Sequence, residues 1–182
     1  MSNCIDYNCN DLEDHLMNDC AEEILGGQDQ IVLFDCDHQM TDPSNGTQVN
    51  AEITAGRAIL IKNVKVGMDL ASPVELDSNI ANRTPTLVTY DRSLSYIDGN
   101  VNNHNVNTFY PSWFNGRTLG GVLIYENGNE TKAVTWIDEP CRATGSRIIP
   151  PDSNEFQRFE GVIKWRAKDE PKRYSAPSGV FS

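Results

Sequence analysis

The sequence predicts a mainly β protein: a β-sandwich with a short N-terminal helix, long loops and an aromatic spacing that allows a second short helix. Beyond Gly26-Gly27 the apolar periodicity changes from that of a helix to that of strands. Asn127-Gly128 separates two apolar runs, as in a tight hairpin turn. With 182 residues and 38% hydrophobic residues the chain suits one core, so we expect a single domain over 1–182.

The N-terminal helical segment comprises residues 1–27. Apolar residues recur there at every fourth position, which predicts one amphipathic helix over 9–25: Leu12, Leu16, Cys20 and Ile24. Asn10 or Asp11 would cap this helix, and Gly26-Gly27 would end it. We expect the acidic residues of its other face to be solvated.

The remaining β segments are bounded by turn residues. We expect strands over 30–36, 52–66, 86–97, 119–126, 132–138, 144–149 and 156–167. The segment 52–66 would be one bent strand or two consecutive ones. The run 42–46, Asp-Pro-Ser-Asn-Gly, is a strong turn signal, and 127–130 joins its neighbours into the clearest hairpin.

Three segments have other properties. Residues 67–85 lack a clear periodicity, which predicts a long loop that is functional or ordered by a partner. The Asn-rich stretch 99–116 carries four aromatics at the spacing of a short helix, and we favour core anchoring for them over a sugar-stacking or base-stacking platform: Phe109, Tyr110, Trp113 and Phe114. The C-terminal tail, 171–182, is expected to be extended and bound to the surface.

The charge balance restricts the partners. Twenty-six acidic against fifteen basic residues give a net charge of −11, which repels phosphate and anionic lipid and argues against DNA binding through a basic face. An acidic wall would, however, suit a pore through which DNA slides without sticking. No run of about 18 apolar residues exists to span a membrane. The first residues lack the features of a secretory signal, so we expect folding in a reducing cytoplasm.

Neither an enzyme nor a metal or cofactor site is indicated. The five cysteines include no Cys-x-x-Cys pair, which favours buried thiols over a metal site near His15 and His38: Cys4, Cys9, Cys20, Cys36 and Cys141. The run Asp35-Cys36-Asp37-His38 lacks a second cluster of ligands, and His104 belongs to no catalytic motif. We therefore expect no catalytic residues.

The ordered series of motifs resembles a known family. A cysteine and a glycine pair, Cys20 and Gly26-Gly27, precede the strand 31–34. A strand 92–96 and a short connection follow a long middle section. Gly116-Arg117 then opens the hairpin that begins at 121–128, and 159–165 forms a final strand. In this order the chain resembles the tail-tube-like virion proteins of phages that infect Bacteroidetes, and the resemblance covers most of the chain.

The resemblance implies a β-sandwich whose copies form rings, commonly sixfold, around a lumen that conducts DNA. The expected location is the virion, after assembly in the host cytoplasm, and the expected partners are further copies and neighbouring tail or connector proteins. The middle section 67–85 and the tail are longer than in the family pattern. These departures leave open whether the chain is the tube itself or a ring, adaptor or completion protein.

Two alternatives remain. A capsid decoration or head-fibre protein would also be a β-sandwich, but it would attach to a shell and would not enclose a channel. A carbohydrate-binding module would use Tyr110, Trp113 and Phe114 as a platform, which requires their rings to be exposed. Acidic residues clustered around a bore would favour the tube, whereas scattered ones would favour the decoration protein.

Overall fold

The computed structural model describes residues 29–76, 86–113, 115–126, 132–151 and 155–181. The predicted helix over 9–25 lies outside these residues. The mainly β class is confirmed. In chain order the elements are β1 (Asp29–Phe34), α2 (Gly46–Thr54), β2 (Ala58–Met68), β3 (Ser72–Leu76), β4 (Thr86–Asp98), the π-helical turn η1 (Asn105–Phe109), α3 (Tyr110–Trp113), β5 (Asn115–Leu119), β6 (Gly121–Glu126), β7 (Ala133–Ile137), β8 (Cys141–Ile148), β9 (Arg158–Ala167) and β10 (Lys172–Ser175).

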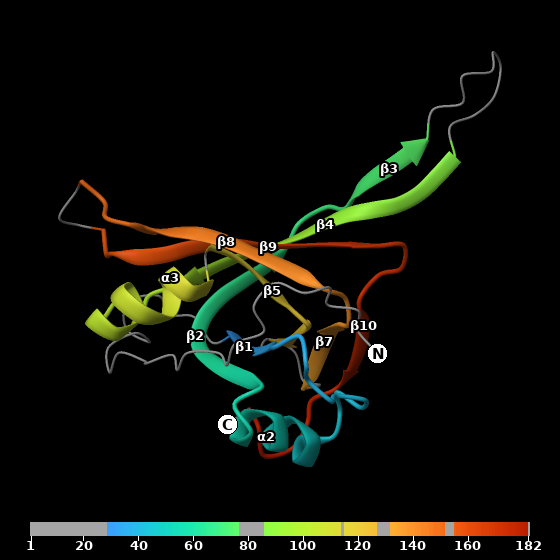
Figure 1. Ribbon diagram of the computed structural model, residues 1–182, viewed down its shortest axis with the longest axis horizontal. Coiled ribbons are helices and arrows are strands. Elements are labelled where there is room, and N and C mark those ends of the chain that lie inside the picture. The colour runs from blue at the N-terminus through green and yellow to red at the C-terminus, as the bar shows by residue number, and fades with distance from the viewer. Residues whose placement is uncertain (1–28, 77–85, 114, 127–131, 152–154, 182) are drawn as a thin grey trace.

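All described strands belong to one antiparallel sheet, in the order β10-β7-β6-β1-β2-β4-β9-β8-β5, with β3 paired to β4. β5 continues into β6 through Gly120, and β7 continues into β8 through residues 138–140. These two long strands therefore form one bent ribbon that contributes to both ends of the sheet. Figure 1 shows β4, β8 and β9 lying over β1, β2 and β7. This arrangement is compatible with a sandwich whose two layers share a single hydrogen-bonded sheet.

Two hydrophobic clusters stabilise the fold. The larger one lies between the layers and includes Ile61, Tyr96, Phe109, Trp113 and Phe159, each no more than 2% exposed. The smaller one lies between β1, β6 and β7 on one side and α2 and the C-terminal residues on the other. Burial of this apolar area is the main driving force for folding the open sheet into two layers.

The bend of the ribbon depends on two glycines. The Gly120 N–H donates to the Phe34 carbonyl oxygen at 2.8 Å. A Cβ on Gly120 would lie 2.3 Å from the Asp35 carbonyl oxygen, and one on Gly121 would lie 2.6 Å from the Trp136 ring. Only glycine lets β5 cross this closely over the end of β1.

The prediction of a strand over 52–66 is wrong at its beginning, because residues 52–54 belong to α2. The predicted turn at 42–46 is present, and its Asn45 caps this helix by accepting hydrogen bonds from the Thr47 and Gln48 N–H groups at 3.0 and 3.3 Å. Val49 and Glu52, three residues apart, form the buried face of the helix. The strand itself, β2, begins at Ala58.

The prediction of a loop over 67–85 is also wrong for the residues that the structure describes. β2 continues to Met68, and β3 pairs with β4 from Ser72 to Leu76. The tail is extended as predicted, but it is more than a surface segment. β10 pairs with β7, and the Phe181 ring stacks on Tyr125 with 4.8 Å between centroids.

Other predictions are confirmed with shifted boundaries. β6 and β7 pair as the predicted hairpin, and the segment 105–113 is helical. The strand predicted over 144–149 begins earlier, at Cys141, because Leu119 pairs with it and extends the ribbon. β5 was not predicted as a separate strand.

Candidate functional site

The most exposed feature of the fold is a two-stranded arm, which consists of β3 and residues 86–89 of β4. β4 pairs with β9 only from Tyr90 onward, so the arm residues of β4 pair with β3 alone. Figure 1 shows the arm extending away from the layers at the upper right. Its outer strand edges therefore have no partner among the described strands and are free for main-chain hydrogen bonds to another chain.

Apolar side chains of the arm face solvent. Leu76 is 65% exposed, Leu87 39% and Val88 44%, and Leu70 at the base of the arm is 96% exposed. An isolated hairpin of two strands is marginally stable in water. The exposed apolar side chains lie on both faces of this hairpin, because Leu87 stands opposite Glu75, whose neighbour Leu76 points to the other side. The arm can therefore gain stability by packing on another surface.

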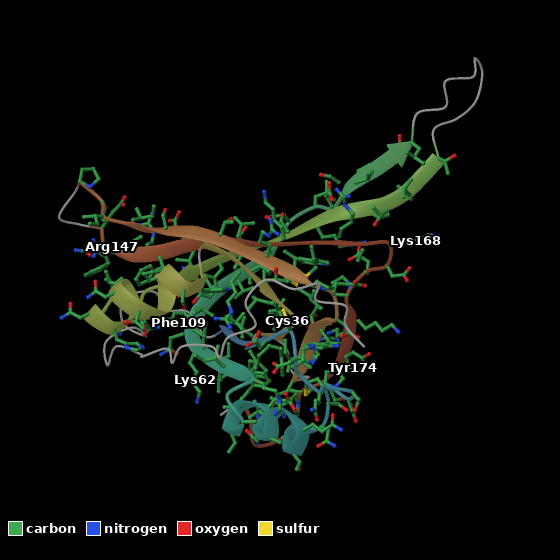
Figure 2. The ribbon with its side chains drawn as sticks, viewed as in Figure 1. Cys36, Lys62, Phe109, Arg147, Lys168 and Tyr174 are labelled. Carbon is green, nitrogen blue, oxygen red and sulfur yellow. The ribbon has the colours of Figure 1, made fainter. Side chains whose placement is uncertain are left out.

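A second apolar end lies at the β8–β9 connection. Ile149 and Phe156, which lie within this connection, are 59% and 60% exposed. Figure 1 places the connection at the left, at the opposite end of the long axis from the arm. Figure 2 shows the same separation, with Arg147 near this end and Lys168 on the opposite side. One subunit thus presents two different apolar ends.

A cationic groove lies at β4, β8 and β9, at the base of the arm. Its volume is about 830 Å³. Its exposed charged residues are Asp91, Arg142, Lys164 and Arg166, and the buried Arg92 also lines it. Arg166 Nε lies 2.7 Å from Asp91 Oδ1, and this hydrogen bond lowers the pKa of Asp91. Arg142 stands directly opposite Lys164 in the β8–β9 register.

An acidic pocket of about 290 Å³ opens beside the groove. Its carboxylates come from the β7–β8 connection and from the segment after β9, and they belong to Asp138, Glu139, Asp169 and Glu170. Trp136, Trp165 and Tyr174 form its aromatic walls. Burial raises the pKa of Glu139, and the neighbouring Asp138 raises it further. Glu170 Oε1 lies 2.7 Å from Arg92 Nη1, which joins the pocket to the groove.

Sequence reasoning missed a buried polar cluster around Asp98. Its Oδ2 accepts from the Tyr96 and Tyr110 hydroxyls, and its Oδ1 accepts from the Asn100 N–H at 2.8 Å. Burial raises the pKa of both tyrosines well above the usual value, with the Asp98 charge also contributing, so both stay protonated donors. The cluster fastens the helical segment 105–113 to β4.

The Asp35-Cys36-Asp37-His38 run has structural contacts in the fold. Burial raises the pKa of Asp35, and the Arg117 guanidinium, 3.1 Å away, partly opposes this. The His38 ring packs between Phe34 and Trp136, with centroids 5.4 and 5.8 Å apart. Within the described residues, no group of three or more His, Cys, Asp or Glu side chains could hold a metal ion.

The other cysteine, histidine and aromatic residues singled out from the sequence lie either in the described fold or outside the described residues. The Sγ atoms of the thiols Cys36 and Cys141 lie 3.3 and 2.9 Å from the Thr118 and Glu139 carbonyl oxygens. Cys4, Cys9, Cys20, His15 and Phe114 lie outside the described residues. Tyr110 and Trp113 are at most 2% exposed, which confirms core anchoring for these two rings.

No protein-family model matches the chain. No curated protein is significantly similar to it. In the described part of the chain, no helix is long and apolar enough to cross a membrane.

Proposed function

We propose that this chain is a structural subunit of a tailed-phage virion, a tail-tube or tail-ring protein whose copies assemble into rings around a DNA-conducting channel. The observation that carries the proposal is the arm formed by β3 and residues 86–89. It projects from a closed core with open strand edges and exposed apolar side chains, which a monomer does not need. The family resemblance of the sequence supports the same reading.

The two apolar ends suit assembly into a ring. The arm and the β8–β9 end are different surfaces, so contact between them would be heterologous, and a heterologous contact closes into a ring when its rotation allows. Neighbouring tail or connector proteins would meet the faces of such a ring. The proposed role is non-catalytic.

The carbohydrate-binding alternative loses its main support. Its platform needs exposed rings at Tyr110 and Trp113, whereas both rings pack in the core against Tyr96 and Phe159. A decoration or head-fibre protein remains the alternative, and it would carry no central channel.

The test is the assembly state of the purified protein. Light scattering over a concentration series and negative-stain imaging should show rings or stacked rings with a central hole. The variant L76D/L87D places charges on the arm, where both side chains are exposed. It should keep the fold but shift assembly to at least about tenfold higher concentration, since each buried apolar side chain is worth about 1.5–3 kcal/mol.

The matched control is T47D/A51D, which adds the same charge on exposed positions of α2. This variant should assemble like the wild type. A wild-type protein that stays monomeric at all concentrations would contradict the proposal and favour the decoration protein. Equal assembly of both variants would show that the arm is not the contact.

A further inference from the structure

The cationic groove contains two residues of like charge that stand directly opposite each other on neighbouring strands. Arg142 on β8 and Lys164 on β9 are register partners, and both side chains are exposed on the outer face. Like charges directly opposite each other on neighbouring strands destabilise a sheet. Neither side chain forms an ion pair within the described part of the chain. Asp91 is hydrogen-bonded to Arg166, and the charge of Lys164 contributes to its lowered pKa. An anionic partner in the groove would relieve this repulsion.

The exposed charges of the groove are mainly positive. Arg142, Lys164 and Arg166 line it with one carboxylate, Asp91, while the buried Arg92 pairs with Glu170. A surface of one sign steers an oppositely charged partner.

The acidic pocket has the complementary property. Of its four carboxylates, Glu170 pairs with Arg92, and Asp138, Glu139 and Asp169 share the pocket with one cation, Lys172. The neighbours Asp138 and Glu139 form no ion pair within the described residues, and their mutual repulsion contributes to the raised pKa of Glu139. Cations supplied by a partner would therefore stabilise the charged carboxylates of the pocket.

We propose that the cationic groove of one copy receives the rim of the acidic pocket of a second copy, with Arg142 and Lys164 facing Asp138 and Glu139. This inference rests on the proposed self-assembly and identifies the contact that orients it. Opposite charges on two surfaces of one subunit favour a heterologous contact between copies. The Arg92–Glu170 ion pair lies between the two surfaces.

The test uses charge reversal on each surface separately. The groove variant is R142E/K164E, and the pocket variant is D138K/E139K. All four side chains are exposed, so both variants should keep the wild-type circular dichroism and melting temperature. Each variant alone should assemble only at concentrations at least tenfold above the wild type, because both of its surfaces carry the same sign.

Mixing the two variants gives the decisive result. The groove variant keeps its acidic pocket, which fits the cationic groove of the pocket variant. The reversed groove is acidic and the reversed pocket is cationic, so these two surfaces also fit each other. An equimolar mixture should therefore recover assembly to within about threefold of the wild-type concentration. Each variant changes the net charge of the chain, which is −11, by four units, so both variants stay net negative. General attraction between oppositely charged proteins therefore does not explain the recovery.

The control is K65E/K132E, which reverses two exposed lysines away from both surfaces. It should assemble like the wild type and should not rescue the pocket variant. Assembly of the wild type should also weaken with added salt, because exposed charges are screened.

Other outcomes overturn the inference in distinguishable ways. If the wild type forms rings and R142E/K164E does so equally well, this contact is wrong while the proposed function stands. If the mixture fails to assemble, the two surfaces do not face each other. If R142E/K164E loses only an affinity for duplex DNA, the groove is a nucleic-acid site. A wild type that never assembles would overturn both proposals.

Discussion

At the scale of single residues, Glu52 shows how α2 is fixed to the sheet. Its carboxylate accepts hydrogen bonds from Arg57 Nε and Nη2 at 2.8 and 2.9 Å, and its side chain is 6% exposed. The Gln39 N–H donates to the same carboxylate at 3.3 Å. The Arg57 hydrogen bond is the largest cause of the lowered pKa of Glu52. The charged form of Glu52 is therefore the one that stabilises the fold.

We predict that Glu52→Gln lowers the free energy of unfolding by about 2 kcal/mol at neutral pH, because it removes charge-assisted hydrogen bonds. The folded-state pKa of Glu52 lies below its ordinary value of 4.5, so this stabilisation is complete above that value and is lost as the pH falls through the folded-state pKa. Urea unfolding at several pH values should show the difference between wild type and E52Q narrowing on acidification.

Glu75→Gln is the control for this measurement, because Glu75 is exposed on the arm and forms no ion pair within the described residues. It should change the unfolding free energy by no more than about 0.5 kcal/mol. A difference between wild type and E52Q that stays constant down to low pH would mean that the Glu52 charge contributes nothing.

At the scale of elements, the bend between β5 and β6 should tolerate no side chain. We predict that Gly120→Ala destabilises the protein by about 1–3 kcal/mol, because the new Cβ would lie 2.3 Å from the Asp35 carbonyl oxygen and backbone atoms would have to move. Thermal unfolding measures this loss. Gly67→Ala is the matched control: its Cβ meets nothing within 4 Å, so the change should be neutral or slightly stabilising. Equal effects of both substitutions would contradict the crowding argument.

Elements with local signals were predictable from the sequence. The β6–β7 hairpin was found because Asn127-Gly128 lies between two apolar runs, and the helix over 105–113 because its aromatics repeat at helical spacing. The helix α2 was not predicted, because the residue that caps it, Asn45, also fits a turn sequence.

Elements defined by distant partners were not predictable. Both faces of β3 are largely exposed, so its sequence shows no clear alternation of apolar and polar residues. Only its pairing with β4 makes it a strand. The cluster at Asp98 joins Tyr96 to Tyr110 across the loop after β4. The Arg142–Lys164 pair likewise exists only in the β8–β9 register. The candidate surfaces thus depend on pairings that sequence patterns do not encode.

At the scale of the whole molecule, the groove is the surface that could meet a nucleic acid. Arg142, Lys164 and Arg166 are the exposed cations that line it. In the proposed assembly the acidic pocket of a neighbour covers these cations, so they no longer face solvent. The cover keeps them from the phosphate backbone, which suits a channel that DNA crosses without binding.

We predict that assembled wild-type protein does not bind duplex DNA. Fluorescence anisotropy of a labelled short duplex at about 0.1 M salt should show no saturation up to about 100 μM protein, a range in which ordinary non-specific DNA-binding proteins saturate. The informative comparison is D138K/E139K alone, whose groove lacks its acidic partner: it should bind the duplex weakly, and added salt should abolish that binding. Saturable binding by the assembled wild type, lost in R142E/K164E, would mean that the groove stays open in the assembly and meets phosphate.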